Sequence, residues 1–220
     1  MFPERLIAGY RSFLGDRFPR ERSRFAALAE AGQRPEVMVI GCCDSRVSPE
    51  VVFDASPGEL FVVRNVANLV PPYAPDGDYH GTSAALEFAV QALKVKHIVI
   101  LGHARCGGIQ AFAEGAAPLS RGDFIGKWMT MIAPAAERLG SRDGDDDYLG
   151  RLERAAIEQS LKNLMTFPYV AEQVDTGQLA LHGAYFGVAT GVLLVRDPQS
   201  GNFAPATADG PTRHSASRPR

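Results

Sequence analysis

The amino-acid sequence predicts an α/β fold: a mainly parallel, Rossmann-like central sheet with an antiparallel edge strand, flanked by helices and preceded by an N-terminal helical arm. The first observation is a set of short, apolar, β-branched runs, which are typical of strands buried on both faces. The second is that helical patterns lie between these runs, and this alternation favours a parallel sheet with right-handed crossovers. The third is a short link between the last two runs, which favours antiparallel pairing.

Three strands are predicted in the first half of the chain, at residues 36–42 (EVMVIGC), 59–67 (ELFVVRNVA) and 97–103 (HIVILGH). A helix is expected over 81–95, where Thr82 or Ser83 would be the N-cap and apolar residues recur on one face. This order of strand, helix and strand suits a parallel sheet.

In the second half, helices are predicted from the paired glycines at 107 and 108, over 123–139, and over 151–167, where Pro168 ends the helix. The sheet should then resume with the two strands at 178–187 and 191–197. Residues 1–200 are expected to form a single domain that includes a helical arm over 1–32. Residues 201–220 are rich in Pro, Ser and Thr and are expected to be a flexible tail.

The composition excludes several classes of protein. A net charge of -2 with 45% hydrophobic residues indicates a soluble globular protein and gives no reason to expect nucleic acid or a membrane as partner. Glu4 and Asp16 interrupt the N-terminal apolar residues, so a secretory signal is not expected, and no run approaches the roughly 18 apolar residues of a membrane span. We therefore expect a cytoplasmic location.

The three cysteines, Cys42, Cys43 and Cys106, are an odd number in a chain without an export signal. A disulfide framework is therefore not expected. Reduced thiols, metal ligands, a nucleophile or a redox pair at Cys42 and Cys43 remain as alternatives.

One constellation favours a metal. Cys42 ends the first predicted strand, His103 ends the third, and Cys106 follows three residues later at a turn into a helix. In a doubly wound sheet, sites form beyond the carboxyl ends of the strands where the strand order reverses. Two sulfurs and one nitrogen suit zinc, and three protein ligands leave the open fourth position of a catalytic site. The alternative is a buried core thiol and a strand-end histidine of no further role.

Asp44 lies two residues past Cys42 and has two possible roles. It could be the fourth ligand, or it could pair with Arg46 and leave the metal open to water. The alternative is a surface salt bridge in a turn. Because two thiolates neutralise the charge of zinc, its water should be less acidified than at an all-histidine site, so activity should favour neutral to alkaline pH.

The motifs C-x-D-S-R at 42–46 and H-x-x-C at 103–106 resemble those of the β-class carbonic anhydrases. The resemblance covers most of residues 34–195. It implies one Zn²⁺ per chain held by Cys42, His103 and Cys106, and reversible hydration of CO2 to bicarbonate and a proton by a zinc-bound hydroxide. It also implies that Asp44 and Arg46 form a catalytic dyad that orients this nucleophile. Cys43 occupies the variable position between Cys42 and Asp44 and is expected to be a small packed residue.

The resemblance further implies an active site at the interface of a homodimer, or of a dimer-based tetramer or octamer, with the arm packed on the partner subunit. The pocket for CO2 would be small and apolar. The residues that fall on substrate-binding positions are Gln33, Phe61, Val66, Tyr79 and Gly107. For Phe61 and Val66, plain core packing is the competing interpretation. Tyr79 and His80 are also candidates for a proton relay.

The sequence departs from one bicarbonate-regulated subclass of the family. Where that subclass has a Trp, an Arg and a Tyr, this chain has Val39, Arg64 and Phe186. Tyr185 is one residue early, and alternation along a strand would point it to the opposite face. We therefore expect a plant-like, open site in which Asp44 pairs with Arg46.

Three rival functions remain open on the sequence alone. A carbonyl sulfide or carbon disulfide hydrolase would use the same zinc ligands. A zinc-stabilised regulatory protein would bind the metal without turnover. A thiol redox protein would use Cys42 and Cys43 and hold no stoichiometric metal.

Overall fold

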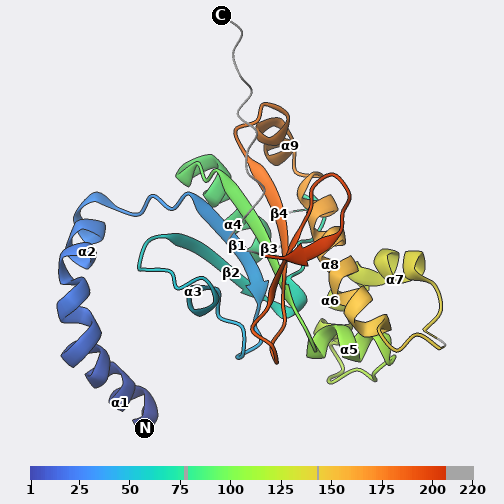
Figure 1. Ribbon diagram of the computed structural model, residues 1–220, viewed down its shortest axis with the longest axis horizontal. Helices are drawn as coiled ribbons and strands as arrows, with labels where there is room; N and C mark the ends of the chain where they lie inside the picture. Colours follow the sequence, from blue (N-terminus) through green and yellow to red (C-terminus); the bar gives the residue numbers. More distant parts are fainter. Residues whose placement is uncertain (77–78, 143, 207–220) are drawn as a thin grey trace, which may run out of the picture.

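A six-stranded sheet forms the centre of the computed structural model, which describes residues 1–76, 79–142 and 144–206. The strands are β1 (Val37–Cys42), β2 (Leu60–Asn65), β3 (His97–His103), β4 (Ala180–Phe186), β5 (Leu193–Arg196) and β6 (Phe203–Pro205). Their spatial order is β2-β1-β3-β4-β5-β6 (Figure 1). The first four strands of this order are parallel, whereas β5 and β6 pair antiparallel. The predicted α/β class and its antiparallel edge are therefore confirmed.

The sheet edge extends further than the sequence predicts. β6 pairs with β5, and Phe203 packs against the main core cluster. This short strand lies inside the stretch expected to be a flexible tail, so an ordered segment continues beyond residue 200. Residues 207–220 of that predicted tail lie outside the described part of the chain.

The helices are α1 (Glu4–Ser12), α2 (Phe18–Ala31), α3 (Pro49–Val52), α4 (Gly81–Glu87), α5 (Gly107–Ala113), α6 (Phe124–Met129), α7 (Ala133–Leu139), α8 (Tyr148–Leu164) and α9 (Pro168–Asp175). Short π-helical segments join α1 to α2 (Phe13–Arg17) and extend α4 (Phe88–Leu93). Two 3-10 turns lie at Val66–Asn68 and Thr130–Ile132. None of the described helices combines the length and the apolar character that a membrane span requires.

The structure corrects the predicted N-cap of the helix after β2 and adds a helix that begins at Pro168. α4 begins at Gly81, and the Thr82 hydroxyl accepts a hydrogen bond from Asn65 Nδ2 at 3.2 Å instead of capping the helix. α8 ends at Leu164, before Pro168 as expected, and Pro168 begins α9, a helix that the sequence analysis missed. Proline suits this first helical position because the N–H that it lacks would have no partner there.

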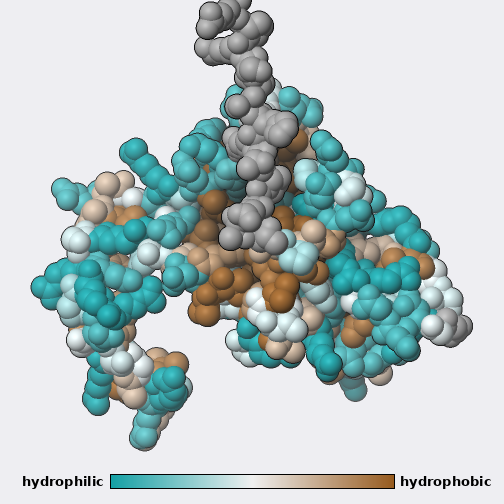
Figure 2. Space-filling model, in the orientation of Figure 1, coloured by the Kyte–Doolittle hydropathy of each residue, from teal (hydrophilic) through white to brown (hydrophobic). Residues whose placement is uncertain are grey.

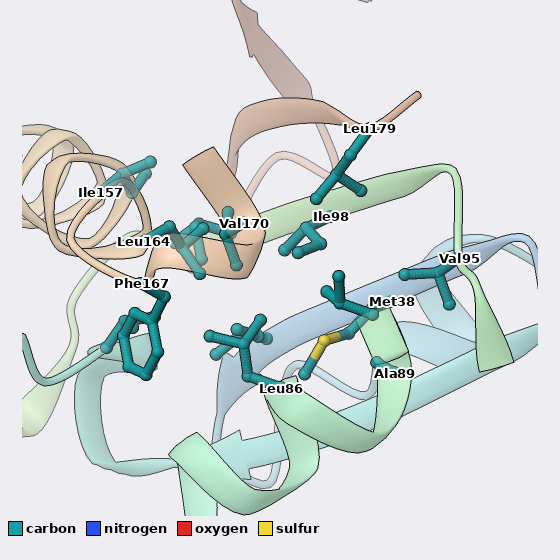
Figure 3. Packing of buried hydrophobic residues seen from close by; sticks show 14 of the residues in the cluster. Met38, Leu86, Ala89, Val95, Ile98, Ile157, Leu164, Phe167, Val170 and Leu179 are labelled. Atoms are coloured by element: carbon teal, nitrogen blue, oxygen red, sulfur yellow. The ribbon is translucent and has the colours of Figure 1, made fainter. Parts of the chain in front are cut away.

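The main core lies between the sheet and α4, α8 and α9. Figure 3 shows Met38 and Ile98 from the strands facing Leu86 from α4 and Leu164 from α8. Because side chains alternate along a strand, Val39 lies on the opposite face of the sheet with Leu101 and Ala184. On that second face, partly buried hydrophobic residues remain, and Figure 2 shows hydrophobic surface gathered over the strands.

The arm formed by α1 and α2 extends away from the sheet (Figure 1), and none of its helical residues is buried. Its aromatic rings pack on one another, with Phe13 and Phe18 each within 6.0 Å of Phe25. Arg24 connects it to the body by donating to the Pro57 carbonyl at 2.6 Å and pairing with Glu59 at 3.1 Å. Leu28 of α2 also lies close to Gly58, so the arm contacts the body of its own chain through both polar and apolar side chains.

Candidate metal centre

Cys42, His103 and Cys106 meet at the carboxyl ends of the parallel strands. Cys42 ends β1 and His103 ends β3, and the strand order reverses between these neighbours, because β2 lies on the other side of β1. The three ligand atoms lie within 4.8 Å of one another, and all three residues are buried. The two sulfur atoms are 4.0 Å apart. This is the junction at which an open α/β sheet forms a site.

The turn between His103 and Cys106 depends on an unusual backbone conformation. Arg105 adopts a positive φ of 58°, in the left-handed region that non-glycine residues rarely occupy. α5 then begins at Gly107, immediately after Cys106. Strain of this kind persists where the surrounding structure holds it, and here it brings both ligands to one side of the turn.

The backbone also surrounds the Cys42 sulfur with donors. The amides of Asp44 and Ala67 both donate to Cys42 Sγ at 3.4 Å. Ala67 and Asn68 have positive φ values of 64° and 49°. The backbone is therefore strained at two consecutive residues, the first of which donates its amide to the Cys42 sulfur. Arg64 fixes the same turn by donating to the carbonyls of Cys42 and Asp44 at 2.8 and 2.7 Å.

His103 presents one ring nitrogen to the two thiols. Its Nδ1–H donates to the Ala104 carbonyl at 3.0 Å, which leaves the lone pair on Nε2. Nε2 is buried without a hydrogen-bond partner, and among the described residues only Asn68 Nδ2 shares that state. A buried polar atom left unpaired costs about 1–3 kcal/mol. Two sulfurs and an unpaired imidazole nitrogen therefore fit a zinc ion.

The cluster favours a thiolate. The hydrogen bond with Cys106 lowers the pKa of Cys42 to about 4, and the same interaction raises the pKa of Cys106. Burial alone would lower the pKa of His103, but the neighbouring Cys42 sulfur and the Ala104 carbonyl raise it overall. The site thus concentrates negative charge where a cation would bind.

Asp44 is turned toward Arg46. Arg46 donates from Nε and Nη2 to the two carboxylate oxygens at 2.9 and 2.7 Å, and its backbone amide adds a third bond at 2.9 Å. The side-chain hydrogen bonds from Arg46 hold the pKa of Asp44 well below its usual range. Arg46 is held in turn by the carbonyl of Arg105 at 3.0 Å. Asp44 Oδ2 still lies 3.9 Å from His103 Nε2, so the carboxylate borders the cluster.

Of the predicted substrate-binding residues, two lie beside this cluster. Val66 packs in the same apolar cluster as Cys42 and Cys106, and Gly107 follows Cys106 directly. Tyr79 lies on the loop before α4 with its side chain fully exposed. His80, the other candidate for a relay, pairs with Asp76 at 2.7 Å.

Gln33 and Phe61 lie at the other end of the sheet within their own chain. Phe61 is paired with Met38, four residues before the pairing of Cys42 with Asn65, which is about 13 Å along the strand. Its ring packs near Phe88, with centroids 5.9 Å apart, and against the main core cluster. Gln33 is exposed before β1 begins. One chain therefore does not bring these two residues to its own Cys–His–Cys cluster.

Two further positions are settled by the structure. Cys43 is exposed, so the expectation of a packed residue is wrong: the backbone turns outward after β1 ends. Tyr185 and Phe186 lie on opposite faces of the sheet, as alternation predicts, because Tyr185 packs with the main core cluster and Phe186 with the residues on the second face.

Sequence reasoning missed several residues that build the site. Ala67 and Arg105 contribute through positive φ values, a conformation that usually occurs at glycine. Because neither residue is a glycine, the sequence gives no sign of this conformation. Glu153 reads as one more charged residue of an amphipathic helix, yet it is buried and accepts a hydrogen bond from the Cys106 amide.

The close approach of α5 to the 3-10 turn gives a stability test. A Cβ at Gly108 would lie 2.7 Å from Val66 Cγ1 and 3.3 Å from Met129 Sδ, whereas at Gly107 it would meet nothing within 4 Å. Gly108→Ala should lower the free energy of unfolding by about 1–3 kcal/mol through overpacking. Gly107→Ala is the matched control and should lower the free energy of unfolding far less. Urea denaturation of both variants provides the measurement. Equal effects of the two substitutions would contradict this packing.

Three comparisons with known proteins agree. A family model described as "Carbonic anhydrase" matches residues 37–193. Beta carbonic anhydrase 3 of Arabidopsis thaliana is 36% identical over 195 residues, which are 86% of this chain and 74% of that protein. The chloroplastic beta carbonic anhydrase 5 of the same plant is 42% identical over 162 residues, covering 72% of this chain but only 53% of the relative.

Solved structures give the same result. The β-carbonic anhydrase CcaA superposes with a TM-score of 0.82 at 28% identity, covering 93% of this chain and 92% of that one. One of two tetrameric β-carbonic anhydrases of Sordaria macrospora superposes with a TM-score of 0.74 at 30% identity, covering 91% of this chain and 98% of that one.

Proposed function

The chain belongs to the β-carbonic anhydrases, a family of zinc enzymes whose activity is that of a carbonate dehydratase, and from this premise we propose how its own residues carry out the reaction. The proposed reaction is CO2 + H2O ⇌ HCO3⁻ + H⁺, with Cys42, His103 and Cys106 holding one Zn²⁺ per chain. The observation that carries the assignment is the buried, unpaired Nε2 of His103 between two thiols.

When bound, Zn²⁺ supplies Lewis-acid chemistry that makes water nucleophilic near neutral pH. Because Arg46 donates to both oxygens of Asp44, this carboxylate would be held by the arginine and would not serve as a further ligand of the ion. As an ionised carboxylate it can only accept hydrogen bonds, and so it fixes the direction of the attacking O–H. Arg46 keeps this carboxylate ionised and aligned. We assign the two residues as a catalytic dyad on this basis.

Substrate binding in this proposal is divided between two subunits. Val66 and Gly107 border the cluster of their own chain, while Gln33 and Phe61 lie at the opposite end of the sheet. The latter two could therefore contact CO2 only in the site of a partner. Phe61 would supply an apolar wall and Gln33 a hydrogen-bond donor, and Tyr79 would join them from its exposed loop.

The homodimer that this division needs is also supported by the arm. Helices α1 and α2 and the π-helical segment between them have no buried residue in one chain, and this includes Phe13 and Phe18. We propose that residues 1–32 of a single-domain chain pack on the partner. The Sordaria macrospora relatives are described as tetrameric, which fits a dimer as the repeated unit.

The direct test of the function is metal analysis of the purified protein together with stopped-flow hydration of CO2. About one zinc per chain with rapid hydration is the expected result, since three protein ligands are present. The same assay with carbonyl sulfide separates the hydrolase alternative. Stoichiometric zinc without hydration of CO2 would overturn the proposed activity.

Mixing two inactive variants tests the shared site. One variant carries Gln33→Ala and Phe61→Ala, and the other carries Cys42→Ser. Random exchange gives heterodimers in about half of the molecules, each with one complete site of two, so about a quarter of wild-type activity should return. The measurement is CO2 hydration after co-refolding or co-expression. Activity no higher than that of the separate variants would mean that each chain completes its own site.

A further inference from the structure

Glu153 of α8 is a buried acid directly behind the candidate metal centre. Its side chain is 2% exposed. Oε1 accepts a hydrogen bond from the Cys106 backbone amide at 2.8 Å, and Oε2 accepts one from the Tyr185 hydroxyl at 2.7 Å. The carboxyl group therefore joins three elements: α8, β4 and the turn that carries Cys106.

This arrangement needs an explanation, because a buried carboxyl group is costly unless it is well paired. Among the described residues, the buried polar or charged side chains are few, and Glu153 is the one acid in that set. Its interactions are both hydrogen bonds to neutral donors. Burial, followed by the hydrogen bond to Glu153, raises the pKa of Tyr185, so the hydroxyl remains a donor. The Arg154 guanidinium lies over the Tyr185 ring, with its Cζ 5.5 Å from the ring centroid.

The Cys106 amide has no helical partner to donate to. Cys106 is the N-cap of α5, where the first backbone N–H groups lie beyond the hydrogen-bonded turns of the helix. Arg105, with its positive φ, lies immediately before it. The bond to Glu153 therefore holds the backbone of Cys106 directly after a residue in a strained conformation.

We propose that Glu153, oriented by Tyr185, is a positioning residue for the metal centre: it fixes the Cys106 backbone and, through it, the direction of Cys106 Sγ. The inference rests on the proposed function, in which Cys106 is a zinc ligand. Groups that orient metal ligands in this way typically contribute 10–100-fold to metal affinity. The negative charge of Glu153 also adds to that of the two thiolates and favours retention of a cation.

Three substitutions separate geometry from charge. Glu153→Ala removes both hydrogen bonds. Glu153→Gln removes the charge but keeps an oxygen that accepts from the Cys106 amide, and its NH2 group can donate to the Tyr185 hydroxyl, which then acts as the acceptor. Tyr185→Phe removes only the donor to Oε2. Glu158→Gln is the matched control, because Glu158 lies on the same helix and pairs with Arg196 instead.

The readouts are zinc affinity by chelator competition and the visible absorption spectrum of the Co²⁺-loaded protein, which reports ligand geometry. We expect Glu153→Ala to weaken zinc binding about 10–100-fold and to change the Co²⁺ spectrum. Glu153→Gln should retain the wild-type Co²⁺ spectrum and lose less zinc affinity than Glu153→Ala. The zinc affinity of Tyr185→Phe should lie between those of these two variants. Glu158→Gln should leave both readouts unchanged.

Zinc affinity within twofold of wild type and an unchanged Co²⁺ spectrum in both Glu153→Ala and Tyr185→Phe would overturn the inference. Should Glu153→Ala not fold, Glu153→Gln and Tyr185→Phe decide on the same criteria. A wild-type protein without stoichiometric zinc would instead overturn the proposed function, so the two failures are distinct.

Discussion

Cys42→Ser is expected to abolish both stoichiometric zinc and CO2 hydration. Cys42 is the ligand around which the others are arranged, since it shares a hydrogen bond with Cys106 and two backbone amides point at its sulfur. A serine hydroxyl is a far weaker ligand for zinc than a thiolate whose pKa lies at about 4. Zinc content should fall from about one per chain to near zero, measured by elemental analysis, and the stopped-flow rate should fall to background.

Cys43→Ser is the matched control for this loss. Cys43 is the next residue but is exposed and outside the Cys–His–Cys cluster. The control variant should keep both zinc and activity. Activity that survives Cys42→Ser and is lost in Cys43→Ser would instead favour a thiol mechanism at the exposed cysteine.

Asp44→Asn should lower kcat about 10²-fold while zinc content stays near one per chain. The amide cannot hold both Arg46 donors as a carboxylate does, and its NH2 group donates where an acceptor is needed. The loss of one preorganised hydrogen-bonding group at a reacting centre typically has this size. Stopped-flow kinetics and metal analysis of the same preparation provide the measurement.

Asp197→Asn serves as the carboxylate control, because the Asp197 carboxylate accepts hydrogen bonds within its own turn, from the amides of Gln199 and Ser200 and from the Ser200 hydroxyl. It should leave kcat unchanged. The dyad assignment would be wrong if Asp44→Asn retained wild-type kcat. A loss of zinc together with kcat in Asp44→Asn would mean that the carboxylate helps to hold the metal.

The strands of this fold could be predicted closely because a buried parallel strand has a local sequence pattern, a short run of apolar, β-branched residues. β3 has the predicted bounds, and β1 begins one residue after its predicted start. β6 was missed because it is short, ends in Pro205 and depends on pairing with β5 rather than on a pattern of its own. The N-cap of α4 was misjudged for a similar reason, since a distant residue, Asn65, binds the Thr82 hydroxyl.

The sequence by itself determined which chemistry this protein carries: the identities of Cys42, His103 and Cys106, the positions of the first two at strand ends and of the third at the start of a helix, and an acid and an arginine two residues apart. Spacing and residue type are local properties, and so they can be identified from the sequence without the three-dimensional structure.

Only the tertiary structure decided how these groups are held. It turns Asp44 toward Arg46 through the carbonyl of Arg105, leaves His103 Nε2 unpaired, and buries Glu153 against Cys106. It also separates Phe61 from the cluster of its own chain. The physical reason is that each of these features depends on packing between segments far apart in the sequence, and no local pattern records which distant group fills a hydrogen bond.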